Sequence, residues 1–332
     1  MKRRIVIIGG NLNYNLEQFI CNAFENIGHE VKFIGYKNIL GRKYRESIRM
    51  LATRSHAFRY FSSPFWLEKL NEIYYKNISE YNPDFVLSLK GETISNQTLK
   101  KIKLDLGIKT ALWYPDDPRF FASLVKYIAP SYDMVFTYSE NATKIYNSIG
   151  VHSAKRVPFG CDPKLHYNNF KNIVKENRAI FIGTYSPKRY RFIKSLIKRN
   201  VPIDIAGPYW PPGTAKYVIN KGVYGEQYVE LLKKYSVVLN LHQDINYGPN
   251  MRTFEVTGSG GLLLTDQAED ILSFFSNGKE ILTYNDIDDA QLIIKNILNG
   301  SINTEKIIRK AYATCHSKYS YEIRANEIVT NI

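Results

Sequence analysis

The chain has 332 residues, of which 44% are hydrophobic and 23% are charged, and it contains 25 Tyr and 17 Phe. This aromatic content excludes a disordered chain and indicates a globular protein. Lys and Arg outnumber Asp and Glu by 45 to 31, so the formal net charge is +14 and favours anionic partners. At about 100–200 residues per domain, the length predicts two domains.

Cysteine usage and hydropathy predict where the protein resides. The three cysteines (Cys21, Cys161 and Cys315) are far apart and form no CxxC pair, which argues against a disulfide framework and a zinc site. The basic start, followed by the apolar residues 5–8, is too short for a signal-peptide core. Since no stretch approaches the about 20 apolar residues of a membrane span, we expect a cytoplasmic protein, at most peripheral at the inner membrane face.

Apolar runs alternate with helical patterns along the first half of the chain. Residues 4–10 predict a strand that ends in glycines, and residues 14–28 have helical spacing and end at Gly28. Further strands are predicted at residues 29–36, 83–91, 109–116, 132–139 and 155–160. This rhythm is typical of a parallel sheet with helices on both faces.

The alternation of predicted strands and helices resumes after a polar segment, residues 161–178, which we interpret as a linker. A strand at 179–184 precedes a helix with Ser186 as N-cap and Pro187 at its first position. Further strands are predicted at residues 202–208, 236–243, 261–266 and 279–284. The predicted class is α/β, with two Rossmann-like, doubly wound parallel-sheet domains facing a cleft. The expected boundaries are 1–160, 161–315, and a final helix, 316–332, packing back on the first domain.

Residues 37–61 break this rhythm because they hold seven Lys or Arg and one acidic residue, with aromatic residues interleaved. Two interpretations stay open. The segment is either a solvated basic helix, or a surface for anionic lipid or a phosphorylated acceptor. We expect no nucleic-acid partner, because no RRM, KH or helix-turn-helix pattern is present.

Open α/β sheets bind ligands at the carboxyl ends of their strands. Candidate residues therefore follow the apolar runs. In the second half they are Gly183, Thr184, Arg189, Tyr224, His242, Asn250, Arg252, Glu255, Gly260 and Asp266. In the first half they are Gly10, Lys90, Gly91, Asp116 and Asp117. The candidates of the second half include cations, which can bind an anionic donor, and those of the first half include paired aspartates. Together they suit the transfer of a group from an anionic donor.

Several motifs resemble the CgeB-type glycosyltransferases, which are similar to family 4 of the GT-B fold. The blocks are "WYPDDP" (113–118), "VPFGCDP" (157–163), "FIGTYSPKR" (181–189), "VVLNLHQDINYGPNMRTFEVTGSGGLLLTD" (237–266), "FFSNGKEILTY" (274–284) and "HSKYSYEIRA" (316–325). They occur in the family's order and cover most of the chain. The block containing Arg252, Glu255 and the following glycines is the most specific.

The resemblance implies an acceptor-binding first domain and a second domain that binds a nucleoside-diphosphate sugar, with UDP or GDP favoured. It implies that Arg189 and Arg252 contact the diphosphate and that Glu255 accepts hydrogen bonds from the ribose hydroxyls. No cofactor and no metal are expected, because basic side chains and helix N-termini can stabilise the departing diphosphate. The implied acceptor is a bacterial surface glycan, a lipid-linked glycan or a protein.

Three catalytic candidates have competing structural interpretations. Asp116 and Asp117 are either turn residues or supply a general base, and His242 is either a structural residue or a contact for the donor. Tyr247 stands eight positions before Glu255, where retaining family-4 enzymes commonly have a glutamate, so the stereochemical outcome stays open. A sugar-nucleotide epimerase and a non-catalytic nucleotide- or glycan-binding pseudoenzyme are the alternative functions.

Overall fold

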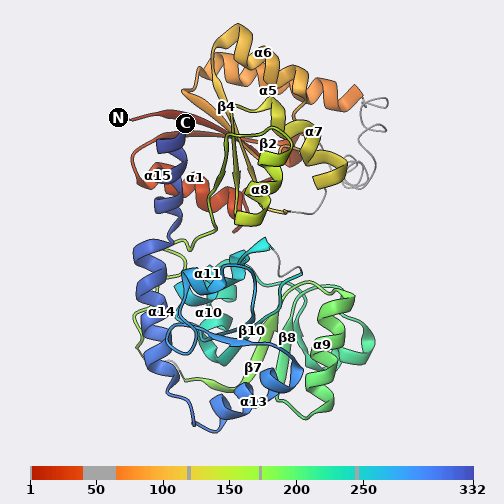
Figure 1. Cartoon of the computed structure of the whole chain (residues 1–332), viewed down its shortest axis with the longest axis vertical. Helices are drawn as coiled ribbons and strands as arrows, with labels where there is room; N and C mark the ends of the chain where they lie inside the picture. The colour runs from red at the N-terminus through yellow and green to blue at the C-terminus, as the bar shows by residue number, and fades with distance from the viewer. Residues whose placement is uncertain (1, 40–64, 118–120, 172–173, 244–246) are drawn as a thin grey trace. The chain divides into compact units, whose positions relative to one another are not determined.

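The computed structural model describes residues 2–39, 65–117, 121–171, 174–243 and 247–332. The chain forms two compact units. Unit 1 contains Met1–Pro158 together with Glu322–Ile332, and unit 2 contains Phe159–Tyr321. In the described ranges no helix is both long and apolar enough to cross a membrane. Each unit is an α/β layered structure with one parallel sheet (Figure 1).

The sheet of unit 1 has six strands in the order β2-β1-β3-β4-β5-β6. Their bounds are β1 Arg4–Gly9, β2 Glu30–Gly35, β3 Phe85–Leu89, β4 Lys109–Tyr114, β5 Met134–Thr137 and β6 Ala154–Arg156. All pairings are parallel, and the central strands are buried along nearly their whole length, as expected for strands covered on both faces. The order reverses between β1 and β3, which is where such sheets bind ligands.

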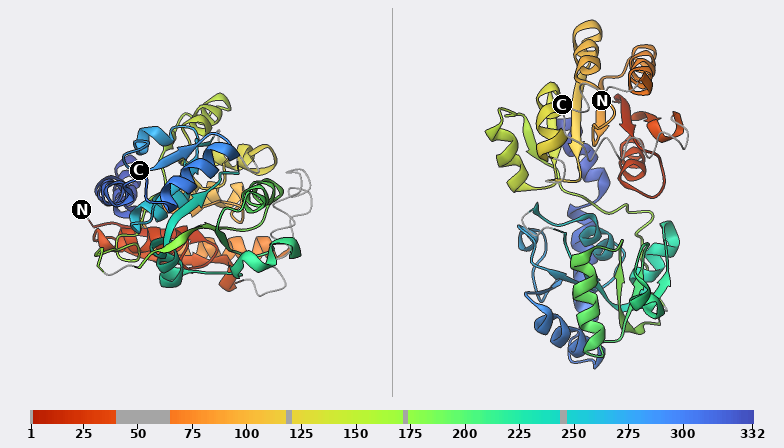
Figure 2. Two further views of the ribbon diagram at one scale, coloured as in Figure 1. Left: turned by 90° about the horizontal axis from the view of Figure 1, so that it is seen from below. Right: turned by 90° about the vertical axis from the view of Figure 1, so that its right-hand side faces the viewer.

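The helices of unit 1 flank this sheet, and the last one returns from the end of the chain. Their bounds are α1 Leu16–Asn26, α2 Tyr36–Ile39, α5 Phe65–Tyr81, α6 Asn96–Leu106, α7 Lys126–Ile128, α8 Glu140–Ser148 and α15 Tyr321–Asn331. Asn26 Nδ2 donates to Glu322 Oε1 at 3.1 Å, which joins α1 to α15. Figures 1 and 2 show both chain ends close together on this unit.

The sheet of unit 2 also has six strands, in the order β12-β11-β10-β7-β8-β9. The strands are β7 Glu176–Ile182, β8 Ile203–Ala206, β9 Val218–Asn220, β10 Tyr235–Asn240, β11 Leu263–Asp266 and β12 Leu282–Tyr284. The helices are α9 Pro187–Lys198, α10 Gly225–Lys234, α11 Met251–Gly258, α12 Ile271–Phe274, α13 Ile287–Leu298 and α14 Thr304–Lys318. The strand order reverses between β7 and β10, so a ligand is expected at the carboxyl ends of these two strands.

The two parallel sheets predicted from the sequence are confirmed, and so is the start of α9. Ser186 is its N-cap and accepts a hydrogen bond from the Arg189 amide, with Pro187 in the first turn. The prediction missed β9, a three-residue edge strand with two exposed side chains. It also placed β6 too far along the chain, because Pro158 cannot donate to a ladder. Residues 40–61 of the basic segment lie outside the described residues.

Candidate functional site

Two helices begin at the carboxyl edge of the sheet in unit 2. Helix α9 follows β7 through Gly183 and Thr184, and α11 follows β10. Asn250 is the N-cap of α11, and its Oδ1 accepts from the Thr253 amide at 3.3 Å. Since helix N-termini carry partial positive charge and unpaired amides, both helix starts favour an anion at this edge.

Two guanidinium groups, of Arg189 and Arg252, lie close together at this edge. Arg189 Nη1 donates to the Thr184 carbonyl at 3.0 Å, and Arg252 Nη1 donates to the Ile182 carbonyl at the end of β7. Burial and the neighbouring Arg252 lower the pKa of Arg189 to about 10, so both groups are cationic at neutral pH. An anion bound between them would relieve this repulsion.

Glu255 faces Arg252 from one turn further along α11 and is 8% exposed. The Arg252 Nε atom lies 3.5 Å from Glu255 Oε2. Tyr228, on α10, donates its hydroxyl to the same Oε2 at 2.6 Å, and Arg252 Cζ lies 5.2 Å from the centre of the Tyr228 ring. The pair of residues predicted from the sequence is therefore part of a group of three, in which Glu255 and Tyr228 are buried and the Arg252 side chain is 21% exposed. Tyr228 was not predicted, because it lies in a different helix 27 residues earlier.

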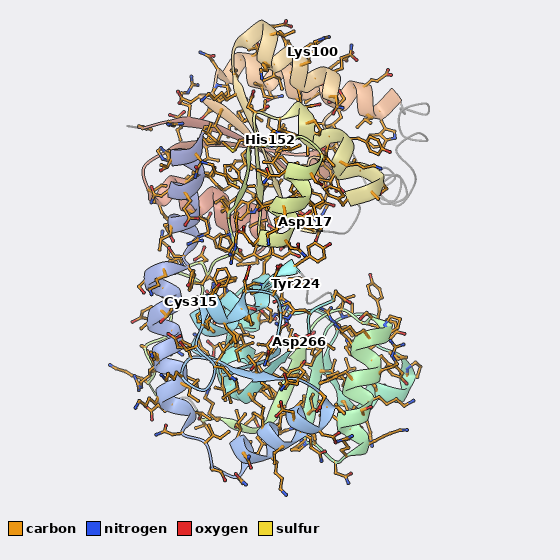
Figure 3. The ribbon with its side chains drawn as sticks, in the orientation of Figure 1. Lys100, Asp117, His152, Tyr224, Asp266 and Cys315 are labelled. Carbon is orange, nitrogen blue, oxygen red and sulfur yellow. The ribbon has the colours of Figure 1, made fainter. Side chains whose placement is uncertain are left out.

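His242, at the end of β10, is held within the protein. Its Nδ1 lies 2.6 Å from Asp266 Oδ1, and its Nε2 accepts from the Asn250 amide at 3.2 Å. The proton is therefore on Nδ1, where it is donated to Asp266, a residue labelled in Figure 3. Because both ring nitrogens are used, this geometry supports an orienting role for His242, which ties β10 to the start of α11.

Lys188 adds a third cation that the sequence prediction did not include. Its Nζ donates to the His242 carbonyl at 2.7 Å and lies 4.0 Å from Asp266 Oδ2. The side chain is 42% exposed, so the charge is accessible to a ligand. Its position beside Arg189, in the first turn of a helix that follows a strand, was the available signal.

The remaining candidates of unit 2 are not all at this edge. Tyr224, the N-cap of α10, follows β9 and is 61% exposed (Figure 3). Gly183 packs so closely on Gly207 that a Cβ atom on Gly207 would lie 2.1 Å from the Gly183 carbonyl oxygen. Gly260 lies beyond the far end of α11, where a Cβ would meet Asn168 Nδ2 at 2.5 Å. Packing around Gly260 therefore leaves no room for a side chain, and a contact of this residue with the donor stays a prediction.

The carboxyl edge of the sheet in unit 1 carries a half-exposed ion pair. Lys90 Nζ lies 2.7 Å from Asp116 Oδ2, and the side chains are 38% and 40% exposed. Burial opposes the Lys90 charge, but Asp116 outweighs it and raises the pKa of Lys90. Gly91 has a φ of +66° and no room for a Cβ, which would approach the Tyr132 hydroxyl to 2.8 Å. Gly10, after β1, donates its amide to Glu17 Oε1 at 3.2 Å.

Asp117 differs from its neighbour Asp116 because it is only 5% exposed. Its carboxylate accepts hydrogen bonds from Thr137 Oγ1 at 2.5 Å and from Tyr146 Oη at 3.1 Å. Burial raises the pKa of Asp117 to about 7, although these two hydrogen bonds oppose the shift. Figure 3 labels this residue in unit 1. The geometry thus separates the two aspartates, and only Asp116 is open to a substrate.

Comparisons with known proteins agree with this architecture. Residues 188–330 match the family described as glycosyl transferase-like. The chain is similar to Anabaena HepE, solved in complex with UDP, with a TM-score of 0.67 at 11% identity over 99% of both chains. It is also similar to a Thermosynechococcus elongatus sucrose-phosphate synthase, with a TM-score of 0.68 at 10% identity over 99% of this chain and 98% of that one. A search of curated proteins found no match.

AviGT4, a glycosyltransferase of avilamycin A biosynthesis, is similar as well, with a TM-score of 0.60 at 17% identity over 99% of this chain and 96% of that one. The chain therefore has the GT-B fold, as the sequence predicted. The match to the glycosyl transferase-like family begins at Lys188, ends at residue 330 and includes Arg252 and Glu255. Among the described residues, no group of three or more His, Cys, Asp or Glu side chains is placed to hold a metal ion.

Proposed function

We propose that the protein transfers a sugar from a nucleoside-diphosphate sugar to an acceptor hydroxyl. The observation that carries this proposal is the pair of guanidinium groups beside two helix N-termini, with a buried carboxylate on the same helix. Cations and helix N-termini match a diphosphate, and a carboxylate matches the hydroxyls of a ribose. The UDP-bound and UDP-glucose-bound structures of HepE favour a uridine nucleotide, with a guanosine nucleotide as the next choice.

In this proposal Arg189, Arg252 and Lys188 contact the diphosphate, and Glu255 accepts from the ribose. Negative charge on the diphosphate grows as the glycosidic bond breaks. Cations fixed in advance around it therefore stabilise the transition state more than the ground state. This is the role that a bound metal ion has in other transferases, so we propose metal-independent turnover.

Asp116 is the proposed general base for the acceptor hydroxyl. Its side chain is 40% exposed, so an acceptor hydroxyl can reach the carboxylate and give up its proton to it. We assign the chain to the CgeB type on the motifs given above, and we propose a glycan, lipid-linked or protein acceptor in bacterial surface-glycan synthesis. A peripheral contact of residues 37–61 with anionic lipid stays a prediction.

Hydrolysis of a panel of nucleotide sugars, read as released nucleoside diphosphate, tests the activity. Release from one UDP- or GDP-sugar, stimulated by acceptor, is the expected result. Binding of a nucleoside diphosphate without release from any sugar donor would instead support the pseudoenzyme.

Chelation tests the proposed independence from metals. EDTA should leave the rate of diphosphate release nearly unchanged, because side-chain cations neutralise the diphosphate. A loss of turnover that added Mg²⁺ or Mn²⁺ restores would contradict the proposal.

A further inference from the structure

Tyr228 is a buried tyrosine whose hydroxyl ends on the carboxylate of Glu255. It is 9% exposed, and its Oη lies 2.6 Å from Glu255 Oε2, the short distance of a hydrogen bond to a charged acceptor. Burial, together with Glu255, raises the pKa of Tyr228 well above its ordinary value despite the nearby Arg252. The hydroxyl therefore keeps its proton and is a donor throughout the physiological pH range.

The two oxygens of Glu255 have different surroundings. Oε2 accepts from Tyr228 and lies 3.5 Å from Arg252 Nε. In the part of the chain that the structure describes, Oε1 has no hydrogen-bond partner. The terminal torsion of a glutamate is broad, so an untethered carboxylate would present either oxygen in many orientations. The Tyr228 hydrogen bond removes this freedom and leaves Oε1 with both of its lone pairs for a ligand.

We propose that Tyr228 is a positioning residue. By holding Oε2, it aims Glu255 Oε1 at the ribose hydroxyls and makes the site selective for ribonucleotides over deoxyribonucleotides. This inference rests on the proposed function, in which Glu255 accepts from the ribose. It adds that one oxygen makes the contact and that a residue of another helix determines the selectivity.

The cation–ring contact makes the phenylalanine variant informative. Arg252 Cζ lies 5.2 Å from the Tyr228 ring centre, and phenylalanine keeps a ring of the same size there. Tyr228→Phe therefore removes only the hydroxyl. Tyr235→Phe is a matched control, because Tyr235 Oη also donates to a carboxylate, Asp204 Oδ2, at 2.9 Å. Tyr235 begins β10, at the edge opposite the candidate site.

Calorimetric titration of UDP, GDP and ADP, each beside its 2′,3′-dideoxy analogue, tests the inference. Wild type should bind its preferred ribonucleotide at least about tenfold more tightly than the analogue, because a hydrogen bond to a charged group is lost. In Tyr228→Phe this ratio should fall to about twofold, through weaker binding of the ribonucleotide, with the affinity for the analogue unchanged. Tyr235→Phe should keep the wild-type ratio.

Other results would overturn the inference. If Tyr228→Phe weakens both ligands equally or only lowers the melting temperature, Tyr228 is a core residue and the proposed function still stands. If wild type does not distinguish the two ligands, the ribose role of Glu255 fails and the inference fails with it. Tyr228→Phe should change the ratio no further in a Glu255→Gln background. A full additional effect there would show that the tyrosine acts without the carboxylate.

Discussion

At the carboxyl edge of the sheet in unit 2, Glu255, His242 and Asp266 form a buried group, whereas the corresponding edge of unit 1 carries the half-exposed Lys90–Asp116 pair. Glu255, His242 and Asp266 are 8%, 2% and 8% exposed, and each is held by at least one further side chain. In unit 1 the Lys90 and Asp116 side chains are 38% and 40% exposed and pair with one another. The same strand topology thus places a buried group of ionisable side chains at one edge and a half-exposed ion pair at the other.

This difference suggests a division of labour. Side chains that neighbours already hold in place lose little conformational entropy when a ligand binds. Such side chains suit a nucleoside diphosphate, which is the same in every turnover. A solvated carboxylate keeps its charge and can exchange a proton with a substrate and with water, as a general base must. Substitutions at the edge of unit 1 should therefore lower turnover and leave nucleotide affinity nearly unchanged. Substitutions at the edge of unit 2 should lower nucleotide affinity.

The largest expected effect is that of Asp116→Asn. An amide cannot take the acceptor proton, so turnover should fall by about 10²–10⁴-fold while nucleotide affinity barely changes. Steady-state rates and calorimetry on the same variant measure both. Asp117→Asn is the neighbouring control and should keep most of the turnover. Equal losses in the two variants would remove the distinction between the aspartates.

Arg252→Ala, in unit 2, should lower both turnover and nucleotide affinity. In the proposed function Arg252 contacts the diphosphate, and it also donates to the Ile182 carbonyl at the end of β7, so turnover should fall by about 10²–10³-fold and nucleotide affinity should fall as well. Arg252→Lys keeps the charge but not the planar set of donors of the guanidinium, so it should recover part of each loss. Unchanged affinity in Arg252→Ala would defeat the assignment to the diphosphate.

Glu255→Gln should weaken nucleotide binding with less effect on turnover at saturation. The ribose does not change during the reaction, so its contact contributes equally to the ground and transition states. Losing a charge-assisted hydrogen bond of about 1.5–3 kcal/mol predicts at least a tenfold loss of affinity. Calorimetry with the diphosphate and with the nucleoside alone checks this. A simple surface-like Arg–Glu pair would leave both affinities as they are in wild type.

The last expected effect is on the stability of unit 1 and involves Asp117. The pKa of this carboxyl is about 7 in the folded protein, against an ordinary value of 3.8 for a solvated aspartate. Between these values the folded state keeps a proton that the unfolded state has lost. Asp117 therefore lowers stability as pH rises, by about 1.4 kcal/mol per pH unit. Asp117→Asn should remove this slope in denaturant unfolding between pH 4 and 7. An identical slope in wild type and variant would place the titration elsewhere.

The sequence predicted the sheets well because buried parallel strands are continuous apolar runs, and β1, β3 and β10 are such runs. It predicted the edge elements poorly. β9 is only three residues long, and its exposed Ile219 gives no alternation to recognise. Local signals, such as the Ser186 N-cap, were reliable because the partner atom is only three residues away.

The candidate site divides in the same way. Arg252 and Glu255 share one helical turn, so spacing alone brings them together. Tyr228 reaches the site through tertiary packing, which one sequence does not encode in its spacing, whereas Lys188 had a local signal in its place beside Arg189 at the start of α9. His242 and Asp117 were candidates because they follow strands, and spacing could not predict the hydrogen bonds that join them to Asp266 and Tyr146. A contact of either residue with a substrate stays a prediction.

Helix α11 also limits which substitutions the protein tolerates far from any ligand. A Cβ on Gly258 would lie 2.5 Å from Cys161 Cβ and 3.4 Å from Cys315 Sγ. Position 258 is therefore restricted to glycine as long as residue 161 has a Cβ atom. Larger side chains at positions 161, 258 or 315 should displace α11, the helix that carries Arg252 and Glu255. Mutational intolerance there would be a consequence of volume, although an assay would report it as lost nucleotide binding.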